Sequence, residues 1–119
     1  MRGNGQKMAT KTVVPVLIRV EGDEITVFPD PVVLHPHEEL EWICFDGDFS
    51  CEFTGTSPFG NKKKFPSTAS RAHAGPHNNV ASGPTARPSR HKYTITVTGV
   101  PKSLDPTVEA DPKTRTPKR

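Results

Sequence analysis

The sequence predicts a single all-β domain, a sandwich or a barrel. Short segments alternate apolar and polar residues, most clearly from Tyr93 to Thr98, and a period of two is typical of a strand with one buried face. Clusters of Gly, Pro, Asp and Ser separate these segments, as turns do. No segment has the 3.6-residue apolar period of a helix. The 119 residues suffice for one domain and not two.

Strands are expected between the turn signals, taken in chain order. Their ranges are 12–20, 25–28, 32–34, 39–45, 49–54 and 93–98, with a short edge strand at 80–81 and a closing segment around Leu104 and Val108. Prolines on either side of 32–34 suit a strand end, because proline cannot donate to a central ladder. Within 39–45, Trp42 and Cys44 share one face, and we expect the opposite face near Phe45 to be covered as well.

Residues 60–90 differ in composition from the predicted strands. They are rich in glycine and proline and poor in apolar side chains, which predicts one long irregular loop anchored by Phe65 and Val80. We therefore expect a disordered tail at 1–11, a domain at 12–110 and a disordered basic tail at 111–119.

The net charge of +3 is unevenly distributed along the chain. Residues 1–60 carry 4 basic and 10 acidic side chains, a net −6, whereas residues 61–119 carry 12 basic and 3 acidic ones, a net +9. We interpret this as attraction between two halves of one domain plus a solvated basic tail. Nucleic-acid binding is not expected, because no aromatic residues alternate with the basic ones to stack on bases.

Three segments resemble the cupredoxin family, and more narrowly the uncharacterised bacterial cupredoxin-like domains. They are Phe28-Pro29-Asp30-Pro31 before a short strand, the strand Glu39-Leu40-Glu41-Trp42, and Tyr93-Thr94-Ile95-Thr96-Val97. The resemblance covers roughly residues 13–110. It implies a Greek-key β-sandwich of cupredoxin-like topology, here with one long irregular loop.

The same resemblance implies where type 1 copper ligands would lie. The family's first histidine would fall at Phe49 or Ser50, and its cysteine would fall at Val97. The second histidine and the methionine would fall between Thr98 and Pro106, a segment with neither residue. A blue-copper site needs a thiolate and two imidazoles. We therefore expect no type 1 copper, no other cofactor, and a core role for Val97.

Other residues could in principle form a different metal site. The candidates are His35, His37, Cys51, His73 and His77. We expect the histidines to be surface or turn residues instead. We expect Cys44 and Cys51 to be two buried free thiols, and the alternative is a disulfide between them.

The sequence favours a non-enzymatic protein that works by binding or as a structural element. It contains no nucleophile elbow, phosphate-binding loop, dinucleotide fingerprint or zinc-protease motif. The expected interaction loop is exposed and contains Ser57, Pro58, Phe59, Lys62, Lys63 and Lys64. Two alternatives remain: a copper-binding electron carrier or copper handler with unorthodox ligands, and a basic surface that binds nucleic acid or anionic surfaces.

The partner, protein or small ligand, and the oligomeric state are not indicated by the sequence. The longest apolar run, Val13 to Ile18, is far shorter than the about 20 residues a membrane span needs. No signal peptide is visible at the start of the chain, so the cytoplasm is the default expectation.

Overall fold

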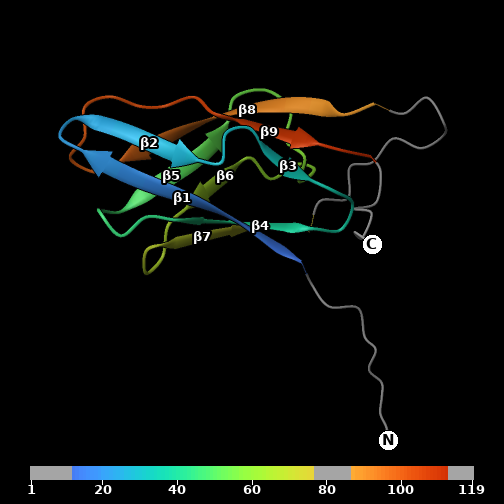
Figure 1. The fold of residues 1–119 in the computed structure, drawn as a ribbon, viewed down its shortest axis with the longest axis horizontal. Coiled ribbons are helices and arrows are strands. Elements are labelled where there is room, and N and C mark those ends of the chain that lie inside the picture. The colour runs from blue at the N-terminus through green and yellow to red at the C-terminus, as the bar shows by residue number, and fades with distance from the viewer. Residues whose placement is uncertain (1–11, 77–86, 113–119) are drawn as a thin grey trace, which may run out of the picture.

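The protein is a two-layer β-sandwich, seen in a computed structural model that describes residues 12–76 and 87–112 (Figure 1). These residues form nine strands and no helix. The strands are β1 (Val13–Glu21), β2 (Glu24–Phe28), β3 (Val32–Leu34), β4 (Glu39–Ile43), β5 (Phe49–Phe53), β6 (Lys64–Pro66), β7 (Arg71–Ala74), β8 (Ser89–Val97) and β9 (Thr107–Ala110). The all-β prediction is therefore confirmed.

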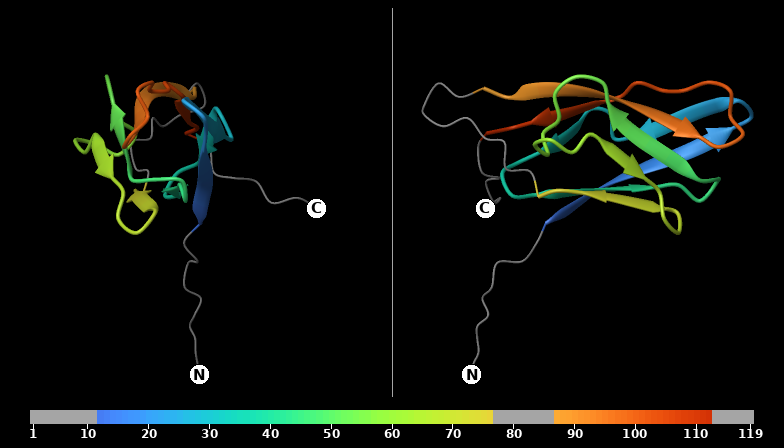
Figure 2. Two further views of the ribbon diagram at one scale, coloured as in Figure 1. Left: turned by 90° about the vertical axis from the view of Figure 1, so that its left-hand side faces the viewer. Right: turned by 180° about the vertical axis from the view of Figure 1, so that it is seen from behind.

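The strands divide into a four-stranded and a five-stranded sheet. The first has the order β2-β1-β4-β7 and the second β3-β9-β8-β5-β6. Figure 2 shows the two layers from the end and from behind. Two pairings are parallel, β1 with β4 and β3 with β9, and the others are antiparallel.

The chain changes sheets at the proline-rich segment between β2 and β3. Pro29 and Pro31 lack the N–H that a ladder requires, so the strand is interrupted there. The Asp30 carboxylate accepts a hydrogen bond of 3.0 Å from the Thr107 backbone N–H, which fastens this crossing to the start of β9. One sequence signal, the pair of prolines, thus explains why β2 and β3 belong to different layers.

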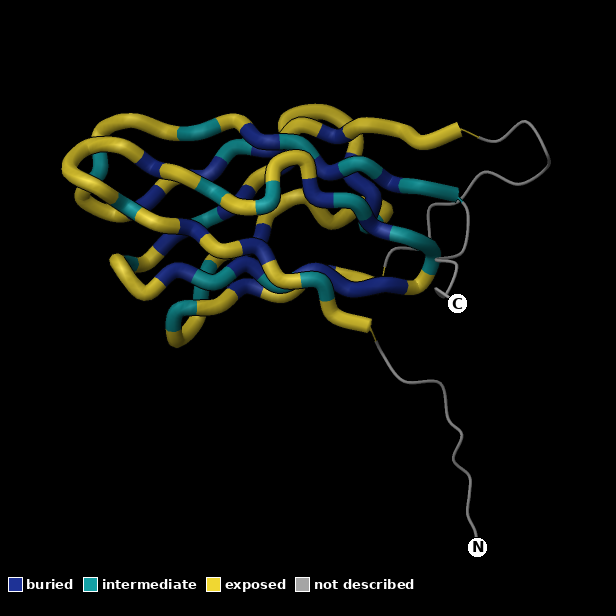
Figure 3. The backbone as a smooth tube through the Cα atoms, in the orientation of Figure 1, coloured by how far each residue is buried: buried dark blue, intermediate teal, exposed yellow. Residues whose placement is uncertain are grey.

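The core lies between the layers and follows the predicted alternation. Buried and exposed residues alternate along β5 and β8 (Figure 3). Trp42 is fully buried and packs against Phe53, Phe65 and Tyr93 with ring centroids 5.4–6.4 Å apart. Val97 is only 4% exposed, so its predicted place in the core is confirmed.

The prediction of one irregular loop over 60–90 is wrong in its first half. Strands β6 and β7 lie within it, and β7 extends the four-stranded sheet by pairing with β4. The sequence of β7 gives little sign of a strand, because alanine has low β-propensity. The ladder to β4 holds it, with Ala72 and Ala74 buried. Phe65 is buried, as expected of an anchor.

Other predicted features differ or lie outside the described residues. Val80, the edge strand 80–81, the tail 1–11 and residues 113–119 are outside them. Strand β4 ends at Ile43 rather than at residue 45. Phe45 is 71% exposed, so the expectation that the sheet face is covered there is wrong.

Candidate functional site

Two apolar side chains fill the end of the sandwich where the resemblance implies copper ligands. Phe49 on β5 lies directly opposite Val97 on β8 in the antiparallel ladder, and each is 4% exposed. Gly47, in the turn before β5, also lies close to this pair, since a Cβ added there would be 3.3 Å from the Val97 Cγ1. The structure thus brings the two predicted positions together, as neighbours in a packed core.

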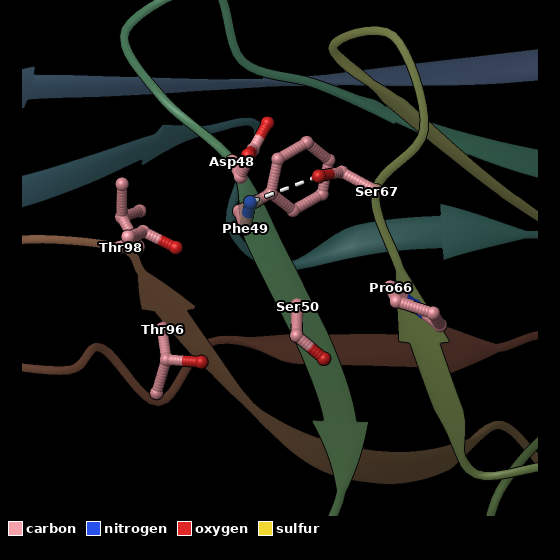
Figure 4. A pocket seen from close by; sticks show the side chains of 8 residues that line it. Asp48, Phe49, Ser50, Pro66, Ser67, Thr96 and Thr98 are labelled. Atoms are coloured by element: carbon pink, nitrogen blue, oxygen red, sulfur yellow. Dashed lines mark hydrogen bonds between the residues drawn. The ribbon is translucent and has the colours of Figure 1, made fainter.

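A pocket of about 390 Å³ opens beside this pair (Figure 4). Its lining contains four hydroxyl groups and one carboxylate, and the residues are Asp48, Phe49, Ser50, Pro66, Ser67, Thr96, Val97 and Thr98. The register pairs Ser50 with Thr96 on one side and with Pro66 on the other. These three side chains therefore form a row on the outer face of the five-stranded sheet.

The hydroxyl groups of this pocket are unequally satisfied. Ser67 Oγ accepts a 2.9 Å hydrogen bond from the Phe49 backbone N–H. Ser50 Oγ is buried and has no hydrogen-bond partner within residues 12–76 and 87–112. None of the eight lining residues is a histidine, cysteine or lysine, so Asp48 is the only titratable side chain among them. Such a lining suits weak binding of a polar molecule better than acid–base chemistry, which needs a matched donor and acceptor.

The structure describes three of the four histidines proposed as metal ligands. His35 is half-buried, with its Nδ1 3.9 Å from the Asp111 carboxylate, while His37 is exposed in the following turn. His73 Nε2 lies 2.8 Å from the Glu39 carboxylate on the four-stranded sheet, and His77 is outside the described residues. Across the described part of the chain, no three His, Cys, Asp or Glu residues are grouped so as to hold a metal ion.

Both cysteines are buried in the core as free thiols and form no disulfide here. Burial raises the pKa of the Cys51 thiol far above its usual value, and the neighbouring Cys44 raises it further. The thiolate is the form that binds metals and attacks electrophiles. Cys51 is therefore a poor metal ligand at neutral pH in this fold.

The predicted interaction loop is only partly exposed. Ser57 and Pro58 are buried, and Ser57 Oγ both donates to the Lys62 carbonyl, at 2.7 Å, and accepts from the Phe59 N–H, at 3.0 Å. The Phe59 ring packs against Phe53 and Phe65 with centroids 5.9 and 5.6 Å away. The exposed part consists of Lys62, Lys63 and Lys64.

His91 is a buried polar residue that sequence reasoning missed. It is 5% exposed and lies on the inner face of β8, two residues before Tyr93. Its Nδ1 lies 2.9 Å from the Thr56 hydroxyl and 3.2 Å from the Thr56 carbonyl. Its Nε2 lies 2.9 Å from the Ser89 hydroxyl, so both ring nitrogens have hydrogen-bond partners. Tyr93, Ile95 and Val97 alternate onto the inner face, and extending this pattern two residues toward the N-terminus would have predicted that His91 is buried.

Burial of His91 should make the protein less stable in mild acid. Burial lowers the pKa of His91, and the Thr56 carbonyl only partly offsets this. The His91 side chain of the unfolded chain has the ordinary histidine pKa of about 6.5, so below this pH it binds a proton that the folded protein does not bind. The free energy of unfolding therefore falls as the pH drops. We expect the free energy of unfolding, measured with urea between pH 7 and pH 5, to fall less steeply with pH for His91→Gln than for the parent. Equal pH slopes in the two proteins would contradict this assignment.

The comparisons with known proteins add no relative. No family model, no curated protein and no solved structure matches this chain. Within residues 12–76 and 87–112, the structure has no helix of the length and apolar character needed to cross a bilayer. What the geometry establishes is a small two-sheet β domain with a packed apolar end and a shallow polar pocket beside it.

Proposed function

We propose that this chain is a non-enzymatic binding domain of cupredoxin-like topology that lacks a type 1 copper centre. The observation that carries the proposal is the pairing of Phe49 with Val97, both buried, at the positions where the resemblance implies a histidine and a cysteine. An imidazole and a thiolate are required ligands of such a centre. Neither phenylalanine nor valine has a side-chain atom that can bind copper.

The strand order supports the Greek-key part of the proposal. Successive strands leave and re-enter the same sheet: β1, β2, β4 and β7 form one layer, and β3, β5, β6, β8 and β9 form the other. Strands β5 and β8, far apart in sequence, are direct neighbours. Connections that cross between layers and return beside an earlier strand are typical of Greek-key sandwiches.

The binding role is inferred from exposed features on a rigid framework. The connection between β5 and β6 is held by the Ser57 hydrogen bonds and by the packed ring of Phe59. It presents Lys62, Lys63 and Lys64 to solvent. Recognition residues commonly occupy loops on such a framework. Catalysis is not favoured, because the pocket beside Val97 offers one carboxylate and no base to pair with it.

Titration of the purified chain with divalent copper tests this proposal. We expect no strong visible thiolate-to-copper absorption band, because the Cys51 thiol is buried and protonated. Weak binding without this band is compatible with scattered surface histidines. A strong band that disappears in Cys51→Ser and persists in Cys44→Ser would reject the proposal and establish the copper-handling alternative.

A further inference from the structure

The pocket beside Val97 has the volume of a small-molecule site and walls that are already in place. Its volume is about 390 Å³, and pockets that bind small molecules commonly measure about 300–1,000 Å³. The Thr98 N–H donates to the Asp48 carbonyl at 2.8 Å, and the Ser67 N–H donates to the Phe49 carbonyl at 2.8 Å. These backbone hydrogen bonds fix both sides of the pocket, which lowers the entropy lost when a ligand binds.

The hollow is explained by the sizes of three side chains in one row across the five-stranded sheet. β5 lies between β6 and β8, and the register places Ser50 between Pro66 and Thr96. Neighbouring strands are about 4.8 Å apart, so the two outer side chains of the row are about 10 Å apart, across a smaller serine. Figure 4 shows Thr96 and Thr98 on one side of β5, and Pro66 and Ser67 on the other. This width admits a single six-membered ring.

The polar groups that a ligand can reach in this pocket are one carboxylate and three hydroxyls. Asp48 is exposed, and its carboxylate has no hydrogen bond or ion pair with any residue that the structure describes. Thr96 and Thr98 are exposed as well. Ser67 Oγ accepts one backbone N–H and keeps its own proton for a second hydrogen bond. Ser50 Oγ is buried, so a ligand does not reach it.

These groups match a neutral ligand that carries several hydroxyl groups. A hydroxyl both donates and accepts, whereas a carboxylate only accepts. Two adjacent hydroxyls of such a ligand can donate to the two Asp48 oxygens, and others can pair with the threonine and serine hydroxyls. Pro66 is exposed at the edge of the pocket, and its ring offers an apolar surface to the C–H face of a sugar ring.

Other classes of ligand fit the lining less well. The eight lining residues include no lysine, arginine or histidine, so a phosphate or carboxylate ligand would meet only the Asp48 charge, which repels it. One carboxylate is too little for calcium, which takes about six to eight oxygen ligands. Phe49 and Val97 are each 4% exposed, so an apolar ligand would gain little contact.

We propose that this pocket binds one hexose unit through the Asp48 carboxylate, the two threonine hydroxyls and the ring of Pro66. The carboxylate makes the strongest contact, because a hydrogen bond to a charged group is roughly twice as strong as one between neutral groups. The site does not include the exposed lysines of the β5–β6 connection. The inference therefore does not rest on the binding role proposed for that connection, nor on the proposal about copper.

Nuclear magnetic resonance titration of the full chain with glucose, galactose and mannose tests the proposal. We expect at least one of these sugars to cause saturable shifts of backbone amide resonances, confined to residues around the pocket such as 48–50 and 96–98. Ethylammonium chloride is the competing probe, because the Asp48 carboxylate attracts cations. Saturation by ethylammonium and by none of the sugars would overturn the proposal. So would the absence of saturable shifts with all three sugars, or shifts that lie elsewhere.

Two matched pairs of variants assign the binding to this pocket. Asp48→Asn should weaken sugar binding by about 10-fold, because it removes the charge from the strongest hydrogen bonds. Asp46→Asn should leave the affinity unchanged, because that carboxylate accepts the Val20 N–H instead. Thr96→Val should weaken binding by about 5-fold, whereas Thr94→Val, on the same face of β8 but outside the lining, should not. If the two members of either pair bind the sugar equally, the proposal is wrong.

Discussion

Trp42→Ala is expected to lower the free energy of unfolding by about 3–5 kcal/mol, the largest effect of any single truncation in this core. The indole is fully buried and touches the rings of Phe53, Phe65 and Tyr93, which belong to three strands of the opposite sheet. Its removal leaves a cavity between the layers that the strands cannot close. A domain of this size has a total stability of roughly 5–15 kcal/mol, so much of the variant should be unfolded on mild heating.

The loss from Trp42→Ala should come mainly from packing, because the buried indole contacts three aromatic rings and its nitrogen makes no hydrogen bond of ordinary geometry among the residues that the structure describes. Urea unfolding followed by circular dichroism measures the effect. Phe45→Ala is the matched control, because that ring is 71% exposed, and it should change stability by no more than about 0.5 kcal/mol in dilute protein. Similar losses in both variants would show that Trp42 does not occupy the core as described.

Val97→Asp is the second substitution with a large expected effect. Val97 is 4% exposed and packs beside Phe49, so an unpaired carboxylate would be placed in an apolar environment. Leaving a buried charge without a partner costs about 3–5 kcal/mol. Burial would also raise the pKa of the new carboxyl in the folded state. The loss should therefore be largest at neutral pH and smaller below about pH 4, where the carboxyl is protonated in both states.

The neighbouring residue supplies the control for Val97→Asp. Thr96 precedes Val97 on β8 but points to the outer face and is exposed. Thr96→Asp should change the free energy of unfolding by only about 0.5 kcal/mol. Thermal or urea unfolding of both variants at two pH values gives the comparison. If the two substitutions cost the same, Val97 does not face the core, and the assignment of this end as closed and apolar fails.

Strands in which large apolar residues alternate with polar ones could be predicted from the sequence. A strand that has no such alternation, and that forms only because a neighbouring strand pairs with it, could not. β5 and β8 were predictable because large apolar residues occupy every second position, and both faces of the ladder follow from that pattern. β7 has the sequence Arg71-Ala72-His73-Ala74, in which no large apolar residue marks the inner face. Its strand conformation depends on hydrogen bonds to β4, a contact that the local sequence does not encode.

At the candidate site too, the sequence identified the residues but not their contacts. The sequence placed apolar residues at Phe49 and Val97, but only the register shows that they are opposite one another. It also treated Ser57, Pro58 and Phe59 as an exposed loop, because serine and proline are typical of loops. In the structure the Ser57 hydroxyl bonds within the turn and the Phe59 ring packs onto the core.

The most direct measurement is the nuclear magnetic resonance spectrum of the full chain, selectively labelled at Val97, with and without an equimolar amount of divalent copper. A closed apolar end predicts a nuclear Overhauser effect between the Val97 methyl groups and the Phe49 ring, because these residues are direct partners in the ladder. It also predicts that the Val97 methyl resonances stay sharp when copper is added. Absence of that Overhauser effect, together with paramagnetic loss of the Val97 resonances, would mean that copper binds at this end of the sandwich and would contradict the account.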